Sequence, residues 1–459
     1  MTISRRNMLQ SGVVAGAAVV GARLASAQPH TGHGTPAPTP PPMPPMPGMP
    51  GMPAPATPAA PPPTARAAPV GGAGYTPVVV PNGSTLPFTL KGGVKIFHLV
   101  AGAVKHQFAP GLDVEAWGYN GSTPGPLIEA VEGDRVRIYV TNKLAEPSTV
   151  HWHGVLLPNG MDGVGGLTQD YILPGRTFKY EFTFSKPGTF MYHPHFDEMT
   201  QIALGMVGMI VVHPKRAKET RPVRDYALMA HEWKVPIGAA RPDPMAMNDF
   251  NVLTFNSKSF PATEPLVAEV GDLVRIRLGN LGPMDHHPIH LHGYAFEVVE
   301  TDGGQVPKAA RWPETTVLVP VGAVRVVEFV ADVPGDWALH CHMTHHVMNQ
   351  MGHDAPNLVG ADVRGLDAQV GRVVPGYMTM GATGMGDMMA MGRPRNSISM
   401  VGGKGPFDMI DMGGMFTIVK VRKRLKAGTD PDWYEHPAGT VADEASDADL
   451  ARDGIKTDS

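Results

Sequence analysis

Four histidine pairs with the spacing His-x-His dominate the chemistry open to this sequence. They occur in two duplicated settings: two pairs are followed by glycine, and two come after a Pro-Gly turn and an aromatic residue. Eight imidazoles gathered together would repel one another if protonated and would be costly to bury unpaired, whereas a bound metal removes both problems. The pairs predict a metal centre held by His151 and His153, His193 and His195, His290 and His292, and His340 and His342.

A second ligand set surrounds Cys341, the only cysteine of the chain. His287 precedes the third pair, while His346 and Met351 follow the fourth. Two imidazoles, one thiolate and a weak thioether are the ligands of a blue electron-transfer copper. Because Cys341 is joined through the backbone to a histidine on each side, an electron reaching this copper has a short covalent route to the second centre.

The composition agrees with copper and excludes an intrachain disulfide and a thiolate zinc cluster. The 459 residues include 20 His and 28 Met but one Cys, so neither an intrachain disulfide nor a thiolate zinc cluster can form. The formal net charge of −4 does not indicate a nucleic-acid partner. Imidazoles and thioethers in the near absence of thiols favour copper.

Short β-strands are expected to position these ligands. The 54 Gly and 47 Pro favour turns over long helices. Residues 135–140 and 178–182 show the period-two pattern of half-buried strands in a sandwich. Residues 131–138 resemble residues 269–276, and each copy leads through an asparagine to a His-x-His-Gly motif. The sequence therefore predicts an all-β protein that contains two copies of one sandwich domain.

We place the first domain at residues 76–214 and the second at residues 225–425, with a charged linker between them and an acidic tail at 426–459. Residues 1–27 have paired arginines, a short apolar stretch and small residues at their end, which resembles a twin-arginine export signal. An uncleaved signal that acts as an anchor is the alternative. Residues 28–75 are rich in Pro, Ala and Met and predict a disordered tether. The protein is expected to be periplasmic or secreted.

The combined motifs resemble those of the multicopper oxidases from about Val80 to Met351, including Asn-Gly-Ser-Thr-Pro-Gly-Pro at residues 120–126. The resemblance implies tandem cupredoxin-like Greek-key domains and four coppers per chain, one of type 1, one of type 2 and two of type 3. It assigns His287, Cys341, His346 and Met351 to type 1, and His151 and His290 to type 2. It assigns His153, His193 and His342 to one type 3 copper, and His195, His292 and His340 to the other.

The spacing within this resemblance selects a subclass. Only 139 positions separate His151 from His290, which leaves no room for the extra domain of three-domain members. The chain therefore resembles the two-domain, small-laccase type. That type implies a homotrimer in which the first domain of one subunit and the second domain of its neighbour share the trinuclear centre.

Comparison of the two repeats predicts that the first domain has no type 1 copper. The positions of the four type 1 ligands are taken by Ser148, Pro194, Met199 and Leu204. We expect the nearby methionines to belong to the core rather than to a site, namely Met199, Met206 and Met209.

Several other residues need an interpretation. Asp162 resembles the acidic residue near the family's trinuclear site and would supply protons to reduced oxygen, although a plain Asp-Gly turn is an equal alternative. His286 and His345 are expected to be exposed neighbours of ligands, and a histidine at 345 stands where many members carry a carboxylate. The isolated histidines are expected to be structural or solvated: His98, His106, His213, His231 and His353.

The resemblance implies an oxidoreductase that couples four one-electron oxidations to the reduction of O2 to two waters. The donor is cuprous ion, a phenol or an aromatic amine. A Met-rich segment at residues 376–415 favours cuprous ion and a part in copper resistance, whereas a flexible lid over an aromatic pocket is the competing interpretation. The alternatives are a copper-resistance protein that binds copper without turnover and a copper nitrite reductase, against which the proline at 194 argues.

Overall fold

The computed structural model describes residues 75–215, 223–236, 238–350, 372–373, 395–399, 402–425 and 431–457. The expected signal and nearly all of the tether lie outside these residues, as do Met351 and the methionines from Met378 to Met391. Strands dominate the described part, and the all-β prediction is confirmed. No helix among the described residues is both long and apolar enough to cross a membrane.

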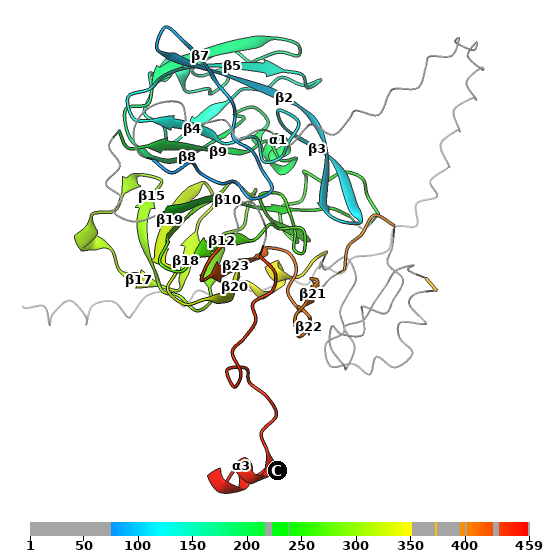
Figure 1. Ribbon diagram of the computed structural model, residues 1–459. Coiled ribbons are helices and arrows are strands. Elements are labelled where there is room, and N and C mark those ends of the chain that lie inside the picture. Colours follow the sequence, from blue (N-terminus) through cyan, green and yellow to red (C-terminus); the bar gives the residue numbers. More distant parts are fainter. Residues whose placement is uncertain are drawn as a thin grey trace, which may run out of the picture. The chain divides into compact units, whose positions relative to one another are not determined.

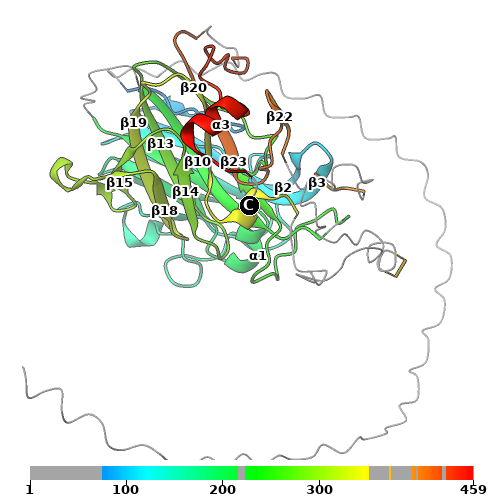
Figure 2. The ribbon, with the colours of Figure 1, turned by 90° about the horizontal axis from the view of Figure 1, so that it is seen from below.

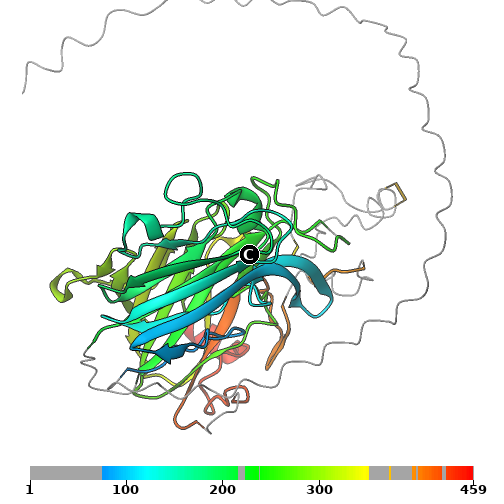
Figure 3. The same ribbon diagram turned by 90° about the horizontal axis from the view of Figure 1, so that it is seen from above.

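The first sandwich has a five-stranded and a four-stranded sheet, which form two layers in Figure 1. The larger sheet contains β1 (Thr89–Lys91), β2 (Val94–Ala109), β5 (Arg135–Asn142), β7 (Thr177–Thr183) and β3 (Leu112–Tyr119), which pairs with β2. The smaller sheet contains, in order, β4 (Ile128–Val131), β9 (Gly208–His213), β8 (Gly188–His193) and β6 (His151–His153). Figure 3 shows the β2–β3 hairpin, in blue and cyan, curving toward its end, where the register shifts between Gln107 and Ala109.

The second sandwich has a seven-stranded and a five-stranded sheet. The larger sheet contains β11 (Val252–Phe255), β10 (Val223–Trp233), β13 (Leu273–Asn280), β19 (Ala323–Val330), β15 (Phe296–Thr301), β16 (Gly304–Gln305) and β17 (Pro313–Glu314). The smaller sheet contains β12 (Leu266–Glu269), β23 (Phe416–Arg422), β20 (Gly335–Cys341), β14 (His287–Leu291) and β18 (Thr316–Val319). Figure 2 shows β10, β13 and β19 side by side.

The two sandwiches repeat the same pairing pattern. In the first, β5 pairs in parallel with β2 and antiparallel with β7, and in the second, β13 does the same with β10 and β19. Asn142 accepts a backbone N–H two residues later at 2.9 Å, and Asn280 does likewise at 2.9 Å. The predicted duplication is therefore visible in strand order, in register and in this asparagine turn.

Period-two alternation builds both cores, because successive side chains on a strand point to opposite faces. On β5, Val136, Ile138 and Val140 are buried while the residues between them are half-exposed.

The remaining elements are short: η2 (Asn159–Met161), α1 (Glu198–Ala203), η3 (Lys308–Ala310), η4 (Thr344–Val347), β21 (Lys404–Gly405), β22 (Asp408–Met409) and α3 (Asp447–Asp453).

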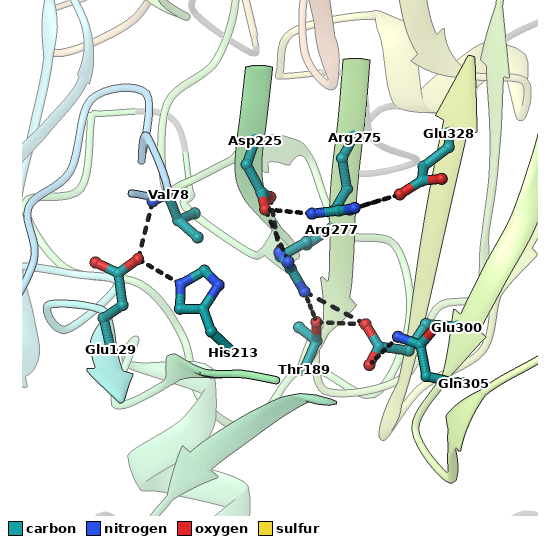
Figure 4. A network of polar contacts seen from close by, with 10 residues as sticks. All are labelled: Val78, Glu129, Thr189, His213, Asp225, Arg275, Arg277, Glu300, Gln305 and Glu328. Carbon is teal, nitrogen blue, oxygen red and sulfur yellow. Dashed lines mark hydrogen bonds and ion pairs between the residues drawn. The ribbon is translucent and has the colours of Figure 1, made fainter. Parts of the chain in front are cut away.

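The two sandwiches meet through an apolar cluster and a buried ionic network. Met191 and Met209 of the first sandwich pack with Val324 and Val326 of the second. The guanidinium of Arg277 binds both carboxylate oxygens of Asp225, at 2.7 and 2.8 Å, and donates to the Thr189 hydroxyl of the first sandwich at 2.6 Å (Figure 4). Because charges this deeply buried are costly unless paired, the network favours one relative placement of the two domains.

Candidate metal centres

Two strand ends and one short helix bring the predicted thiolate site together. His287 opens β14, Cys341 closes β20, and His346 lies on η4. The two strands pair so that Ile289 faces Cys341. The Cys341 Sγ lies 3.8 Å from Nδ1 of His287 and 3.4 Å from Nδ1 of His346, and the two nitrogens are 3.3 Å apart. The three side chains therefore form one group that could hold a metal ion.

This donor set fits a metal ion. A metal bonded to nitrogen and sulfur at about 2.0 to 2.3 Å in a trigonal arrangement separates its donors by about 3.5 to 3.8 Å, close to the observed spacings. Burial raises the pKa of the Cys341 thiol to about 12, with smaller contributions from nearby carboxylates. A metal cation would therefore have to displace the thiol proton. Met351, the expected axial ligand, lies outside the described residues.

Two carboxylates contact the Nε2 atoms of these histidines, and the sequence analysis did not identify either. The Glu232 Oε2 lies 3.3 Å from Nε2 of His287, and the Asp285 Oδ2 lies 3.5 Å from Nε2 of His346. The available signal was Glu232 close to the apolar residues 226–230 and next to Trp233 on β10, since an ionisable residue is rarely buried without a partner.

The first group of four histidines lies at the ends of β6 and β8. His151 and His153 project from one face of β6, with the fully buried Trp152 on the other, and His151 pairs with His193 across the strands. Nδ1 of His153 lies 3.3 Å from Nε2 of His193. The ring of His195 is 5.8 Å from that of His151. We call these four residues the first quartet.

The second group repeats this arrangement on β14 and β20. His290 pairs with His340, and Nε2 of His292 lies 3.1 Å from Nε2 of His340. The ring of His342 is 5.4 Å from that of His290. We call these four residues the second quartet. Within the described part of the chain, the ring contacts between the eight histidines join members of the same quartet.

Hydrogen bonds fix the quartet rings. His151 contacts the Asp162 carbonyl through Nδ1 at 2.7 Å, and His290 contacts the Thr315 carbonyl at 2.8 Å. His193 and His340 each contact the carbonyl of the next residue through Nδ1, at 2.8 and 2.9 Å. Each contact is consistent with a proton on Nδ1 and leaves Nε2 for a metal. Burial, together with neighbouring imidazoles, lowers the pKa of His193 to about 3, which favours the neutral form that metals bind.

Asp162 lies in a turn and close to His151. It ends η2 before Gly163, whose positive φ of 85° belongs to a turn, and its Oδ1 lies 3.5 Å from Nδ1 of His151. A further carboxylate, that of Glu198, lies 3.0 Å from Nε2 of His195 and was not foreseen. The repeat offers a signal for it, because Glu198 occupies in the first copy the place that His345 occupies in the second.

The remaining histidines behave largely as expected. His286 and His345 are exposed. Four isolated histidines have protein contacts: His98 with Thr141, His106 with the Ser257 carbonyl, His213 with Glu129, and His231 with the Trp233 ring. His353 lies outside the described residues.

The methionines near the two sites differ in burial. Met206 and Met209 are buried in the cores, as expected, but Met199 is 53% exposed on α1, so its assignment to the core is wrong. Met415 ends the segment at residues 376–415 that was expected to bind cuprous ion or to form a flexible lid, yet it is fully buried in the second core. Its carbonyl accepts from the Cys341 N–H and its N–H donates to the His346 carbonyl, so it supports the thiolate site from β23's side.

Comparisons with known proteins agree with this geometry. Family models described as multicopper oxidase match residues 101–217 and 236–358. The chain belongs to the multicopper oxidase family. Its fold is similar to that of a blue copper oxidase from Nitrosomonas europaea, with a TM-score of 0.54 and 28% identity over 71% of this chain and 85% of that one. The multicopper oxidase mgLAC has a TM-score of 0.54 and 29% identity over 74% of this chain and 88% of that one.

Curated relatives of this multicopper oxidase chain have several activities in their names. A copper-containing nitrite reductase of Neisseria gonorrhoeae is 28% identical over 52% of this chain and 62% of the relative. A copper resistance protein A homolog of Pseudomonas syringae is 39% identical over 25% of this chain and 19% of the relative. The chain spans less than two thirds of the length of these relatives. Family membership supports copper as the metal of the candidate centres.

Proposed function

We propose that the protein couples four one-electron oxidations of a donor to the reduction of O2 to two waters. The observation that carries this proposal is the position of Cys341. It lies in the sequence between two histidines of the second quartet, and its Sγ is 3.8 Å from Nδ1 of His287 and 3.4 Å from Nδ1 of His346. Copper at the thiolate site would accept electrons singly, and the coppers of the quartets would pass them to O2. A His340 Nδ1 contact to the Cys341 carbonyl, 2.9 Å long, adds a second link between the two centres.

We assign the copper ligands according to the family pattern. The thiolate site would hold its copper through His287, Cys341, His346 and Met351. One type 3 copper would be held by His153, His193 and His342, the other by His195, His292 and His340, and the type 2 copper by His151 and His290. The nitrogens of His153 and His193, and those of His292 and His340, already lie 3.3 and 3.1 Å apart, which supports placing each pair on one copper.

A homotrimer would complete the trinuclear centre, because each of the three coppers assigned to the quartets needs histidines from both of them. Apolar side chains near the first quartet support a protein contact there. Tyr171 packs its ring 5.0 Å from that of Phe196, next to His195, and is 41% exposed. Other exposed apolar residues in this part of the chain are Leu156, Leu167, Leu173 and Met199. Exposed apolar side chains that gather on one surface are typical of a protein interface.

Protons for water formation would come from Asp162, whose carboxylate lies beside His151. An acid at hydrogen-bond reach of the reacting group is the arrangement that proton transfer requires. Export by the paired-arginine signal would place this reaction in the periplasm or outside the cell.

We propose cuprous ion as the principal donor, with phenols as a second class, and a role in copper resistance. The Met-rich segment would bind cuprous ion through its thioethers. Deleting residues 378–391 should lower the rate with cuprous ion about tenfold, corresponding to about 1.4 kcal/mol of lost binding, and leave phenol oxidation nearly unchanged. The matched control replaces by leucine four methionines of the tether at residues 28–75, namely Met43, Met46, Met49 and Met52. Equal losses with both donors would contradict this assignment.

Oxygen uptake by the purified, copper-loaded full chain tests the proposed reaction. We expect four coppers per chain, an intense blue thiolate band, and O2 consumption with cuprous ion and with a phenol. Copper binding without O2 consumption would indicate a binding protein instead. Nitrite reduction without O2 consumption would indicate the nitrite reductase class, whose blue copper is expected in the first domain rather than in the second.

A further inference from the structure

Glu232 is a carboxylate with no access to solvent beside the thiolate site. It lies on β10, and its side chain is fully buried. Its Oε1 accepts the backbone N–H groups of Met284 and Asp285 at 2.6 and 2.8 Å, and its Oε2 lies 3.3 Å from Nε2 of His287. A buried carboxylate is costly without such partners, so its placement needs a reason.

Gly282 provides the space for this carboxylate. A Cβ at position 282 would lie 1.7 Å from the Glu232 Oε2, which no structure tolerates. The glycine is held by its own N–H, which donates to the Asn280 side chain at 2.9 Å. Any larger residue at this turn would therefore push Glu232 away from His287.

The first sandwich contains the same turn without the carboxylate. There Asn142 accepts from Leu144, a residue that is 5% exposed and fills the place of Gly282. The parallel registers align Ala101 with Asn142 and Ala230 with Asn280, so the counterpart of Glu232 is Ala103. The Glu–Gly combination therefore accompanies the cysteine site, and the Ala–Leu combination accompanies the sandwich without it.

We propose that Glu232 is a positioning residue of the thiolate copper site, an inference that rests on the proposed function. By accepting the Nε2 proton of His287, its carboxylate keeps the Nδ1 lone pair directed at the space between Cys341 and His346. Its negative charge also stabilises cupric over cuprous copper and thereby lowers the reduction potential. Partners that hold the second nitrogen of a metal-binding histidine typically change metal affinity by about 10- to 100-fold.

Glu232→Gln tests this role with little change of shape. An amide offers one acceptor oxygen where the carboxylate offers two, so it cannot accept from both backbone groups and from His287 at once. We expect the dissociation constant of the thiolate-site copper to rise about 10- to 100-fold, the potential to rise, and the thiolate absorption band to shift. Glu129→Gln is the matched control, because Glu129 pairs with His213 at 2.7 Å in the first sandwich (Figure 4).

Gly282→Ala provides a second variant. The added Cβ of residue 282 would displace the Glu232 carboxylate without changing the charge of that carboxylate. Wild-type affinity, potential and absorption in Glu232→Gln would overturn the proposal. If that variant does not fold, the nitrogen-15 NMR shifts of His287 in the copper-free wild-type protein decide: a proton on Nε2 supports the proposal, and one on Nδ1 overturns it. The NMR result is independent of turnover, whereas a wild-type protein without a blue band would refute the proposed function itself.

Discussion

The thiolate site of the second sandwich and the equivalent place in the first sandwich contain different side chains with different contacts. In the first, the Ser148 hydroxyl donates to the Gln201 side chain at 2.8 Å, and the Gln201 amide donates to the Pro147 carbonyl at 2.8 Å. In the second, His287, Cys341 and His346 direct two nitrogens and a sulfur at one another. The first place is closed by neutral hydrogen bonds, and the second is a group of three side chains that could hold a metal ion.

The difference shows what the fold itself supplies. Both places have the same strand pairings and the same asparagine turn, so the scaffold does not distinguish them. The distinction lies in a few side chains and in Gly282, which leaves room for a buried carboxylate. A metal site can therefore be present in one copy of a domain and absent from the other without any change of topology.

Replacing the thiolate should have the largest effect. Cys341→Ser removes the soft ligand that a blue copper requires, so we expect loss of the blue band and of measurable donor oxidation. The quartet coppers should remain bound, because their ligands are untouched. Copper counting, together with the visible spectrum, checks this. A variant that keeps the blue band would contradict the assignment of Cys341.

Ser148→Ala tests the corresponding place in the first sandwich. It leaves the buried Gln201 oxygen without its donor, which should lower the free energy of unfolding by about 1 to 3 kcal/mol. Denaturant unfolding measures the loss. The blue band and the copper count should stay at wild-type values, since no metal is expected there. A change in the spectrum would show that the two places are coupled.

A smaller effect should appear in the pH dependence of stability. Burial lowers the pKa of His106 to about 4, and Lys258 adds to this, so the unfolded chain binds a proton below about 6.5 that the folded chain does not. The contribution of His106 is therefore complete above pH 6.5 and is lost as the pH falls toward 4. We expect about 1 kcal/mol between pH 6 and 5.

His106→Gln measures that contribution by difference. Its stability should fall less steeply than that of the wild type between pH 6.5 and 4, as followed by denaturant unfolding at each pH. Parallel curves for the two proteins would refute the assignment. His106 lies on β2 of the first sandwich, so this comparison separates acid sensitivity of the scaffold from loss of metal.

The sequence alone determined the two copies and their strands, because period two and residue spacing are local properties of a chain. It predicted that His287, Cys341 and His346 bind one copper, and the fold brings these three side chains together. It also identified Ser148 as the counterpart of His287, which the hydrogen-bonded pair with Gln201 explains. It could not determine which methionines are buried: Met199 is exposed, and Met415 packs in the second core. Burial depends on which segments return to cover a residue, and spacing does not record that.

The tertiary structure alone decided which groups stand behind the ligands. Glu232 lies 55 residues before His287, and the two meet only because β10 and the chain after β13 pack together. The ring contacts within each quartet were likewise decided by the fold, since the spacing of the motifs does not record which rings lie within contact distance. Strand register and packing bring distant residues into contact, and these depend on the whole core rather than on any single motif.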